Sequence, residues 1–232
     1  MRSLLALIFR KFKSLWATFW MKHSGLSPFG RIATRLASLF SPPYKLRSRL
    51  ARLNTRGYIS PSATIYHANL HLEEHIFIGD GVVIYQAADG GCVKIGKGVH
   101  IHRDSIIETG ANGSLIIGGD THIQPRCQFS AYIGNIVIGS GVQIAPNCAF
   151  YPYNHGVAPD KLIKEQPLQT KGGIVIDDDA WLGVGVIVLD GVRIGKGAVI
   201  GAGSVVFHNI PDGAIAFGVP ARVQKMRNDL DD

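Results

Sequence analysis

A six-residue repeat governs this chain from Ile59 onward. An aliphatic residue recurs at every sixth position, and the residue four places later is mostly small, as in Ile95 with Val99 and Ile101 with Ser105. Towards the C-terminus the aliphatic positions follow one another without a break, at Ile176, Leu182, Val188, Ile194, Ile200 and Val206. Self-similarity at a short fixed period is typical of a solenoid, and six residues suit one short strand with its turn. The repeat therefore predicts an all-β solenoid of short parallel strands, with three strands in each coil.

The same repeat predicts the direction of each side chain. Residues of a strand alternate between two faces, so the aliphatic and the small residue share a narrow interior. Cys127 and Cys148 occupy the small inward position, and we expect them to act as small apolar residues. Three cysteines without paired spacing also argue against a disulfide framework. The last position of the repeat points outward, and in successive coils it holds His100, His122, Gln143 and Trp181.

One step of the repeat is too long. A coil that starts at Ile138 would return near residue 156, but the pattern resumes at Ile176, which leaves about 20 inserted residues, roughly 154–174. Long insertions in a regular domain usually serve binding or catalysis. The chain thus divides into a basic helical segment (1–56), a repeat domain with one inserted loop (57–208) and a C-terminal extension (209–232).

The N-terminal segment is basic and amphipathic. Residues 1–72 hold 12 of the 24 Lys and Arg residues and no Asp or Glu. Apolar residues recur with the spacing of one helical face, at Leu5, Ile8, Phe9, Phe12, Leu15, Trp16, Phe19 and Trp20. Basic residues interrupt this run, so a membrane span is not expected. Three alternatives stay open: the helix lies on an anionic membrane surface, it covers the open end of the solenoid, or it is a cleavable targeting sequence. Because the charge is confined to one end, no nucleic-acid partner is expected.

Several short motifs, in order, resemble those of a known family. They are Ala145-Pro146-Asn147, His155 eight residues later, Glu165-Gln166-Pro167-Leu168, Lys171-Gly172-Gly173-Ile174, Trp181-Leu182-Gly183, Gly201-Ala202-Gly203-Ser204-Val205-Val206 and Gly218-Val219-Pro220-Ala221-Arg222. Together they resemble the hexapeptide-repeat acyltransferases, and in particular the galactoside, maltose, xenobiotic and polysaccharide O-acetyltransferases. The resemblance implies a left-handed parallel β-helix with an N-terminal helical segment and a short C-terminal helix. It also implies a homotrimer that binds acetyl-CoA between subunits.

The resemblance assigns roles to individual residues. His155 matches the family's loop histidine, and imidazole is a suitable general base near neutral pH. The residues expected at acetyl-CoA are Trp181, Gly183, Val184, Gly185, Lys196, Ala202, Gly203, Arg222 and Lys225. Those expected at the acceptor are His122, Asn147, Tyr153 and Asn154. Packing between subunits is an equal alternative for Trp181, and Lys196 and Lys225 also fit ordinary surface lysines. Phe207-His208 departs from the Thr-Lys of many relatives, which puts one phosphate contact in doubt.

The interpretation that follows is an acetyl-CoA-dependent O-acetyltransferase. Its acceptor would be a sugar hydroxyl of a surface polysaccharide or glycolipid, and the enzyme would lie in the cytoplasm, peripheral at the inner face of the cell membrane. A nucleotide-sugar N-acetyltransferase or an antibiotic acetyltransferase would use the same scaffold. A different class is also open, because the ladder of His100 and His122 resembles the zinc site of β-helical carbonic anhydrases. Gln143 interrupts that ladder, so no metal is expected.

Overall fold

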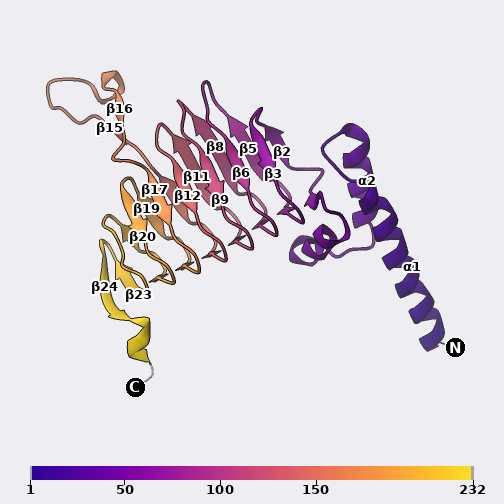
Figure 1. The fold of residues 1–232 in the computed structure, drawn as a ribbon. Coiled ribbons are helices and arrows are strands. Elements are labelled where there is room, and N and C mark those ends of the chain that lie inside the picture. Colours follow the sequence, from indigo (N-terminus) through magenta and orange to yellow (C-terminus); the bar gives the residue numbers. More distant parts are fainter. Residues whose placement is uncertain (1, 231–232) are drawn as a thin grey trace.

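The computed structural model describes residues 2–230 and shows a parallel β-helix of seven coils (Figure 1). Each complete coil contributes one strand to each of three sheets, named here A, B and C in chain order. Sheet A has nine strands, sheet B seven and sheet C six. The predicted parallel β-solenoid with an N-terminal helical region is confirmed.

The strand bounds follow the repeat. Sheet A contains β1 (Tyr58–Ile59), β4 (Phe77–Ile78), β7 (His100–Ile101), β10 (His122–Ile123), β13 (Gln143–Ile144), β18 (Trp181–Leu182), β21 (Val199–Ile200), β23 (Ala214–Gly218) and β24 (Ala221–Met226). Sheet B contains β2 (Thr64–Tyr66), β5 (Val83–Gln86), β8 (Ile106–Gly110), β11 (Gln128–Tyr132), β14 (Ala149–Tyr151), β19 (Ile187–Leu189) and β22 (Val205–Val206). Sheet C contains β3 (Leu70–Leu72), β6 (Val93–Ile95), β9 (Leu115–Ile117), β12 (Ile136–Ile138), β17 (Ile174–Ile176) and β20 (Val192–Ile194).

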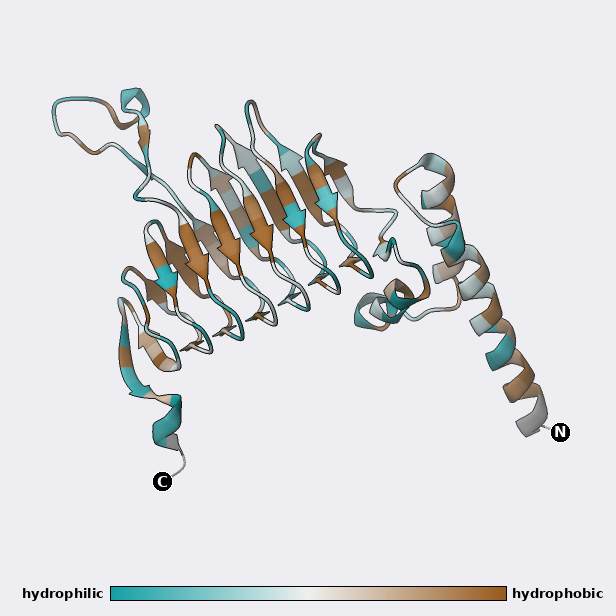
Figure 2. Cartoon of the chain, viewed as in Figure 1, coloured by the Kyte–Doolittle hydropathy of each residue, from teal (hydrophilic) through white to brown (hydrophobic). Residues whose placement is uncertain are grey.

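The core is a column of stacked aliphatic side chains. Ile101 pairs with Ile123 and Ile123 with Ile144, so the repeat position of one coil lies directly on that of the next. Cys127 and Cys148 are buried in this column, as predicted. Each thiol donates to a backbone carbonyl, Cys127 to Ala145 at 3.3 Å and Cys148 to Gly183 at 3.2 Å. The strands are correspondingly apolar (Figure 2).

Two helices and one 3₁₀ helix stand at the N-terminal end of the solenoid: α1 (Arg2–Lys22), α2 (Pro28–Ser38) and η1 (Tyr44–Leu53). The second half of α1 is fixed to the first coils, since Met21 is fully buried in one apolar cluster with Leu50, Tyr58 and Phe77. The Asn54 amide also donates to the Met21 carbonyl at 2.6 Å. This half of α1 therefore covers the open end of the β-helix.

An arm leaves the solenoid between β14 and β17 (Figure 1). It contains β15 (Asn154–His155), the 3₁₀ turn η2 (Ile163–Glu165) and β16 (Leu168–Gln169), and β15 pairs with β16 antiparallel. At the other end of the chain, β23 and β24 form an antiparallel hairpin. The short C-terminal helix is a single 3₁₀ turn, η3 (Arg227–Leu230).

Candidate active site

His155 lies exposed on the arm, where it pairs with Leu168 in the β15–β16 ladder. The Gln166 side chain holds the arm in shape. Its oxygen accepts from the Ala158 backbone N–H at 2.8 Å, and its nitrogen donates to the Ala158 and Lys161 carbonyls at 3.0 Å each. The backbone of His155 is thus carried by a hydrogen-bonded hairpin rather than by an irregular loop, and its side chain is exposed.

Asp190 fastens both ends of the arm to the solenoid. The residue is 6% exposed, at the turn that follows β19. Its carboxylate accepts from the Lys171 backbone N–H at 2.6 Å, the Thr170 hydroxyl at 3.0 Å and the Gly173 backbone N–H at 3.2 Å, all in the returning segment between β16 and β17. It also accepts from the Asn154 amide at 3.4 Å on the outgoing strand. A single carboxylate therefore sets where the arm leaves and where it returns.

Tyrosines gather at the root of the arm. The Tyr153 ring lies 6.0 Å from that of Tyr132 and 6.2 Å from that of Tyr151, measured between centroids. The Tyr153 hydroxyl is 3.4 Å from that of Ser130, and the Tyr151 hydroxyl donates to Gln128 at 2.9 Å. Aromatic faces edged by hydroxyl groups suit a neutral, hydroxyl-bearing acceptor. Burial raises the pKa of the Tyr151 hydroxyl, so the group stays neutral and can donate.

Asn147, Gly185 and Gly203 form a second feature, at the corner between sheets A and B. All three have positive φ, of 64°, 71° and 70° respectively. Their turns stack, because the Gly185 N–H donates to the Pro146 carbonyl at 2.9 Å and the Gly203 N–H to the Val184 carbonyl at 2.8 Å. No atom lies within 4 Å of where a Cβ of Gly185 or Gly203 would stand. The corner thus leaves bare backbone that an extended ligand can approach.

The outward face of sheet A carries the predicted ladder. Register pairs join His100 to His122, His122 to Gln143 and Gln143 to Trp181, and the Trp181 side chain is 54% exposed. The two histidine rings stack with centroids 4.5 Å apart. Beside them lies a hollow of about 390 Å³, which Arg52, His75, Lys97 and Asp120 also line.

The histidines of this face are kept neutral. Burial, with the nearby His122 ring, lowers the pKa of His100 to about 4. Burial, with the nearby His100 ring, lowers the pKa of His102 to about 4, and burial lowers the pKa of His122. Neutral imidazoles both donate and accept hydrogen bonds, and in the hollow they stand beside the charged side chains of Arg52, Lys97 and Asp120. Within residues 2–230 no group of three His, Cys, Asp or Glu side chains is arranged to hold a metal ion.

The remaining sequence-predicted residues lie elsewhere. Lys196 follows β20 at the corner between sheets C and A, where its backbone N–H donates to Asp212 at 3.0 Å. Arg222 and Lys225 are exposed on β24, opposite Phe217 and Ile215 of the hairpin. Gly183, Val184 and Ala202 belong to the same corner as Gly185 and Gly203.

Within one chain, the predicted residues therefore form separate groups. His155, Tyr153 and Asn154 stand where sheet B passes into sheet C, whereas the glycines stand where sheet A passes into sheet B. Lys196 stands at the third corner. The fold brings the members of each group together, but the groups lie at different corners of the solenoid.

Sequence reasoning did not find Asp190. Its context, Leu189-Asp190-Gly191, is that of any turn between two strands. A signal was present, because Asp190 stands 36 residues after Asn154, at the equivalent corner of the next coil once the insertion is removed. The burial of His102, beneath Tyr44 of η1 with ring centroids 6.0 Å apart, was also not foreseen.

Comparison with known proteins supports the repeat assignment. Residues 173–208 match the family model described as bacterial transferase hexapeptide (six repeats). A 77-residue segment is 49% identical to the galactoside O-acetyltransferase of Lactococcus lactis, covering 33% of this chain and 36% of that protein. A 59-residue segment is 41% identical to the 2,3,4,5-tetrahydropyridine-2,6-dicarboxylate N-acetyltransferase of Staphylococcus aureus, covering 25% of each. The matches thus span about a third or less of these relatives.

Solved structures share the fold. The polySia-specific acetyltransferase NeuO superposes with a TM-score of 0.55 at 23% identity, covering 71% of this chain and 82% of its own. AntD, an N-acyltransferase from Bacillus cereus in complex with dTDP and 3-hydroxybutyryl-CoA, superposes with a TM-score of 0.52 at 22% identity, covering 72% and 78%. Residues 173–208 therefore match the model of the bacterial transferase hexapeptide family, and the solenoid resembles the solved acyltransferase structures in its fold.

Proposed function

We propose that this protein is an acetyl-CoA-dependent O-acetyltransferase that acts on a sugar hydroxyl of a surface polysaccharide or glycolipid. The observation that carries the proposal is His155, held on an ordered arm that a buried carboxylate fixes to a hexapeptide solenoid. The 49% identity with a galactoside O-acetyltransferase supports acyl transfer to a sugar. Structures of AntD, which shares the fold and was solved in complex with 3-hydroxybutyryl-CoA and with Coenzyme A, support the acyl donor.

The proposed chemistry is direct acyl transfer. The imidazole of His155 takes the proton of the acceptor hydroxyl as the hydroxyl oxygen attacks the thioester carbon of acetyl-CoA. The carbon–sulfur bond breaks, the acetyl group stays on the acceptor oxygen, and the imidazolium returns its proton to the departing CoA sulfur. Tyr153 and Asn154, beside the base, and His122 and Asn147 would contact the acceptor.

The separation of the groups on one chain supports a site between subunits. His155 and the bare glycine corner cannot serve the same thioester unless a neighbouring copy brings its corner to the arm. The arm also exposes the apolar side chains of Val157, Leu162 and Ile163, the first of them 79% exposed. An exposed apolar tip is typical of a segment that packs on a partner. We therefore propose a homotrimer, the assembly that the family resemblance implies.

In this arrangement one subunit would offer acetyl-CoA to the base of the next. Gly183, Val184, Gly185, Ala202 and Gly203 would lie along the pantetheine chain, and the exposed Trp181 indole would cover it. Lys196, Arg222 and Lys225 are the proposed partners of the CoA phosphates, because charged donors bind phosphate strongly.

We also propose that the protein acts at the cytoplasmic face of the cell membrane, held there by residues 1–56. Within residues 2–230 no helix is both long and apolar enough to serve as a membrane span. One face of α1 nevertheless exposes Leu5, Phe9, Phe12 and Leu15, in a segment that has no acidic residue. An amphipathic basic helix of this kind suits an interface position.

A second candidate, acyl transfer to an amino group, is favoured by a specific observation. The N-acetyltransferase of Staphylococcus aureus is 41% identical over the matching segment, and AntD, an N-acyltransferase, shares the fold. Both reactions need the same base and the same donor, and they differ only in the nucleophile. Only the identity of the acceptor group, hydroxyl or amine, therefore distinguishes the two candidate functions.

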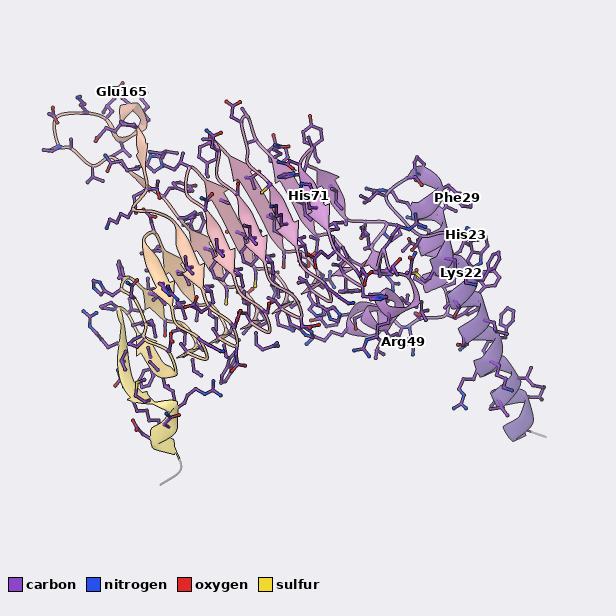
Figure 3. The ribbon with its side chains drawn as sticks, in the orientation of Figure 1. Lys22, His23, Phe29, Arg49, His71 and Glu165 are labelled. Carbon is purple, nitrogen blue, oxygen red and sulfur yellow. The ribbon has the colours of Figure 1, made fainter. Side chains whose placement is uncertain are left out.

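One experiment tests the proposal. Labelled acetyl-CoA is incubated with a panel of sugars, polysaccharides, amino sugars and nucleotide-linked amino sugars, using the wild type, His155→Ala and His71→Ala. His71 is a matched control, because it is an exposed histidine on β3 of the first coil (Figure 3). We expect label on a sugar hydroxyl that depends on His155 and not on His71. Label on amino acceptors alone supports the second candidate, and transfer that His155→Ala does not slow contradicts the mechanism.

A further inference from the structure

A basic groove lies between the middle of α1 and η1, beside the segment that joins α2 to η1. It encloses about 560 Å³ and is lined by Arg10, Lys11, Lys13, Ser14, Ala17, Phe40, Ser41, Arg49, Leu50 and Leu53. Four of these residues are cations and none is acidic. Within residues 2–230 no ion pair joins Arg10, Lys13 or Arg49 to a carboxylate. The groove therefore concentrates positive charge that this chain does not neutralise.

An apolar face borders this groove. On α1 it consists of Leu5, Ile8, Phe9, Phe12, Leu15 and Phe19, and on α2 it continues through Phe29 and Ile32. Leu15 is 71% exposed and Phe29 is 60% exposed. Figure 3 shows Phe29 on the side of the helix pair that is turned away from the solenoid.

Two residues of the groove, Phe40 and Lys13, contact the apolar face. The Phe40 ring lines the groove and lies 6.2 Å from the Phe9 ring and 5.9 Å from the Phe12 ring, between centroids. Lys13 also lines the groove, and its ammonium lies 4.4 Å from the centre of the Phe9 ring. The charged groove and the apolar face thus lie next to each other. In a lipid layer the charged headgroups adjoin the apolar acyl chains in the same way.

The helix pair is held firmly enough to present both features together. The Trp16 indole N–H donates to the Leu36 carbonyl at 2.7 Å, which joins α1 to α2 at the level of the groove. Further along α1, Met21 is buried against Leu50 and Tyr58 of the solenoid cap. The face of α1 that carries Ala17 and Met21 is therefore anchored, while the face that carries Leu15 and Phe19 is exposed.

We propose that this groove is a binding site for the phosphate of an anionic lipid headgroup, with the apolar face of α1 and α2 buried among the acyl chains beside it. The inference rests on the proposed membrane association and narrows it to one site. Arg10 and Arg49 bind the phosphate from opposite walls, since guanidinium groups match phosphate oxygens in geometry. A lipid is the partner that fits, because the positive charge of the groove complements an anionic headgroup and the neighbouring apolar side chains can contact its acyl chains.

The test compares two variants that remove equal charge. Arg10→Gln/Arg49→Gln changes the groove, whereas Lys22→Gln/Arg35→Gln removes two exposed charges from α1 and α2 outside it. Binding is measured by co-sedimentation with phosphatidylcholine vesicles, with and without phosphatidylglycerol, in the absence of acyl donor and acceptor. Circular dichroism and the thermal midpoint verify that both variants fold. The assay does not involve catalysis, so failure of the acetyltransferase proposal would leave it unaffected.

We expect the wild type to bind only the anionic vesicles. The control variant should weaken binding by the general loss of two surface charges. The groove variant should weaken it about tenfold more than the control, which corresponds to about 1.4 kcal/mol. Equal weakening by the two variants overturns the groove while leaving the membrane association. Equal binding of the wild type to both kinds of vesicle, or to neither, overturns the inference and the proposed membrane association together.

Discussion

Replacing Asp190 should release the arm that carries His155 without unfolding the solenoid. In Asp190→Asn, the backbone N–H groups of Lys171 and Gly173 lose a charged acceptor, at 2.6 Å and 3.2 Å in the wild type. Hydrogen bonds to charged groups contribute about 1.5–3 kcal/mol each, so the docked arm loses about 3 kcal/mol or more. That energy corresponds to a shift of about 150-fold in the equilibrium between docked and undocked arm.

The effect should be local, because Asp190 contacts the ends of the arm. Hydrogen exchange should show faster exchange at Lys171 and Gly173, by about 100-fold, with protection unchanged at core strands such as β10. The thermal midpoint of the solenoid should change little. Turnover should fall at least about tenfold, because the base is no longer held in place, while the KM for acetyl-CoA should stay close to that of the wild type.

A matched control is Asp177→Asn. The Asp177 carboxylate also lies at a solenoid corner, but its side-chain partner is the exposed Arg193, whose Nε donates at 2.8 Å. Exposed pairs of this kind contribute little to stability, so exchange in the arm and turnover should match the wild type. Wild-type protection of Lys171 and Gly173 in Asp190→Asn would refute the reasoning, as would an equal loss of turnover in the control.

Three further outcomes are expected. His155→Ala should lower kcat by about 100-fold or more with little change in the KM for acetyl-CoA, and steady-state kinetics over both substrates measure this. Stability should fall as the pH drops from about 6.5 to about 4, because the unfolded chain protonates His100 and His102 below pH 6.5 whereas the fold resists protonation until about pH 4. Urea denaturation across this range measures the loss, and His100→Gln should reduce its steepness; an unchanged slope would contradict the burial argument. Met21→Ser should lower the thermal midpoint by several degrees, since Met21 is fully buried in the cap, whereas Leu15→Ser, at an exposed position, should not.

The fold was predictable because its rule is local and repeated. The residue of each coil that faces inward is set by strand alternation. Ile101 lies upon Ile123 and Ile123 upon Ile144 because the pattern restarts in each coil after 18 residues and three or four extra loop residues. The outward ladder from His100 to Trp181 follows from the same rule. The chemical roles of the residues came instead from the order and spacing of short motifs.

Contacts between distant segments escaped the sequence. The pattern indicated that His100 faces outward but gave no sign that His102 is buried, packed against Phe77 of β4 and against Tyr44 of η1, which stands 58 positions earlier in the chain. No period connects those two segments. The sequence also left open whether the first helix covers the end of the solenoid or lies on a membrane, since both roles need the same amphipathic pattern. On α1 the two roles fall to different faces, with Ala17 and Met21 buried and Leu15 and Phe19 exposed.

The three corners of the prism give the proposed site its shape. A rigid solenoid cannot bend one corner towards another, because every coil is held by its neighbours in three sheets. The arm carries His155 away from its own corner of the solenoid, and Asp190 fixes the two ends of the arm through Asn154 and Lys171. The bare backbone at Gly185 and Gly203 would then serve a base from another copy. Mixing His155→Ala subunits with Gly185→Trp subunits should therefore restore activity in part, since a mixed trimer contains interfaces with one intact arm and one intact corner. Mixtures as inactive as either parent would argue for a site within one chain.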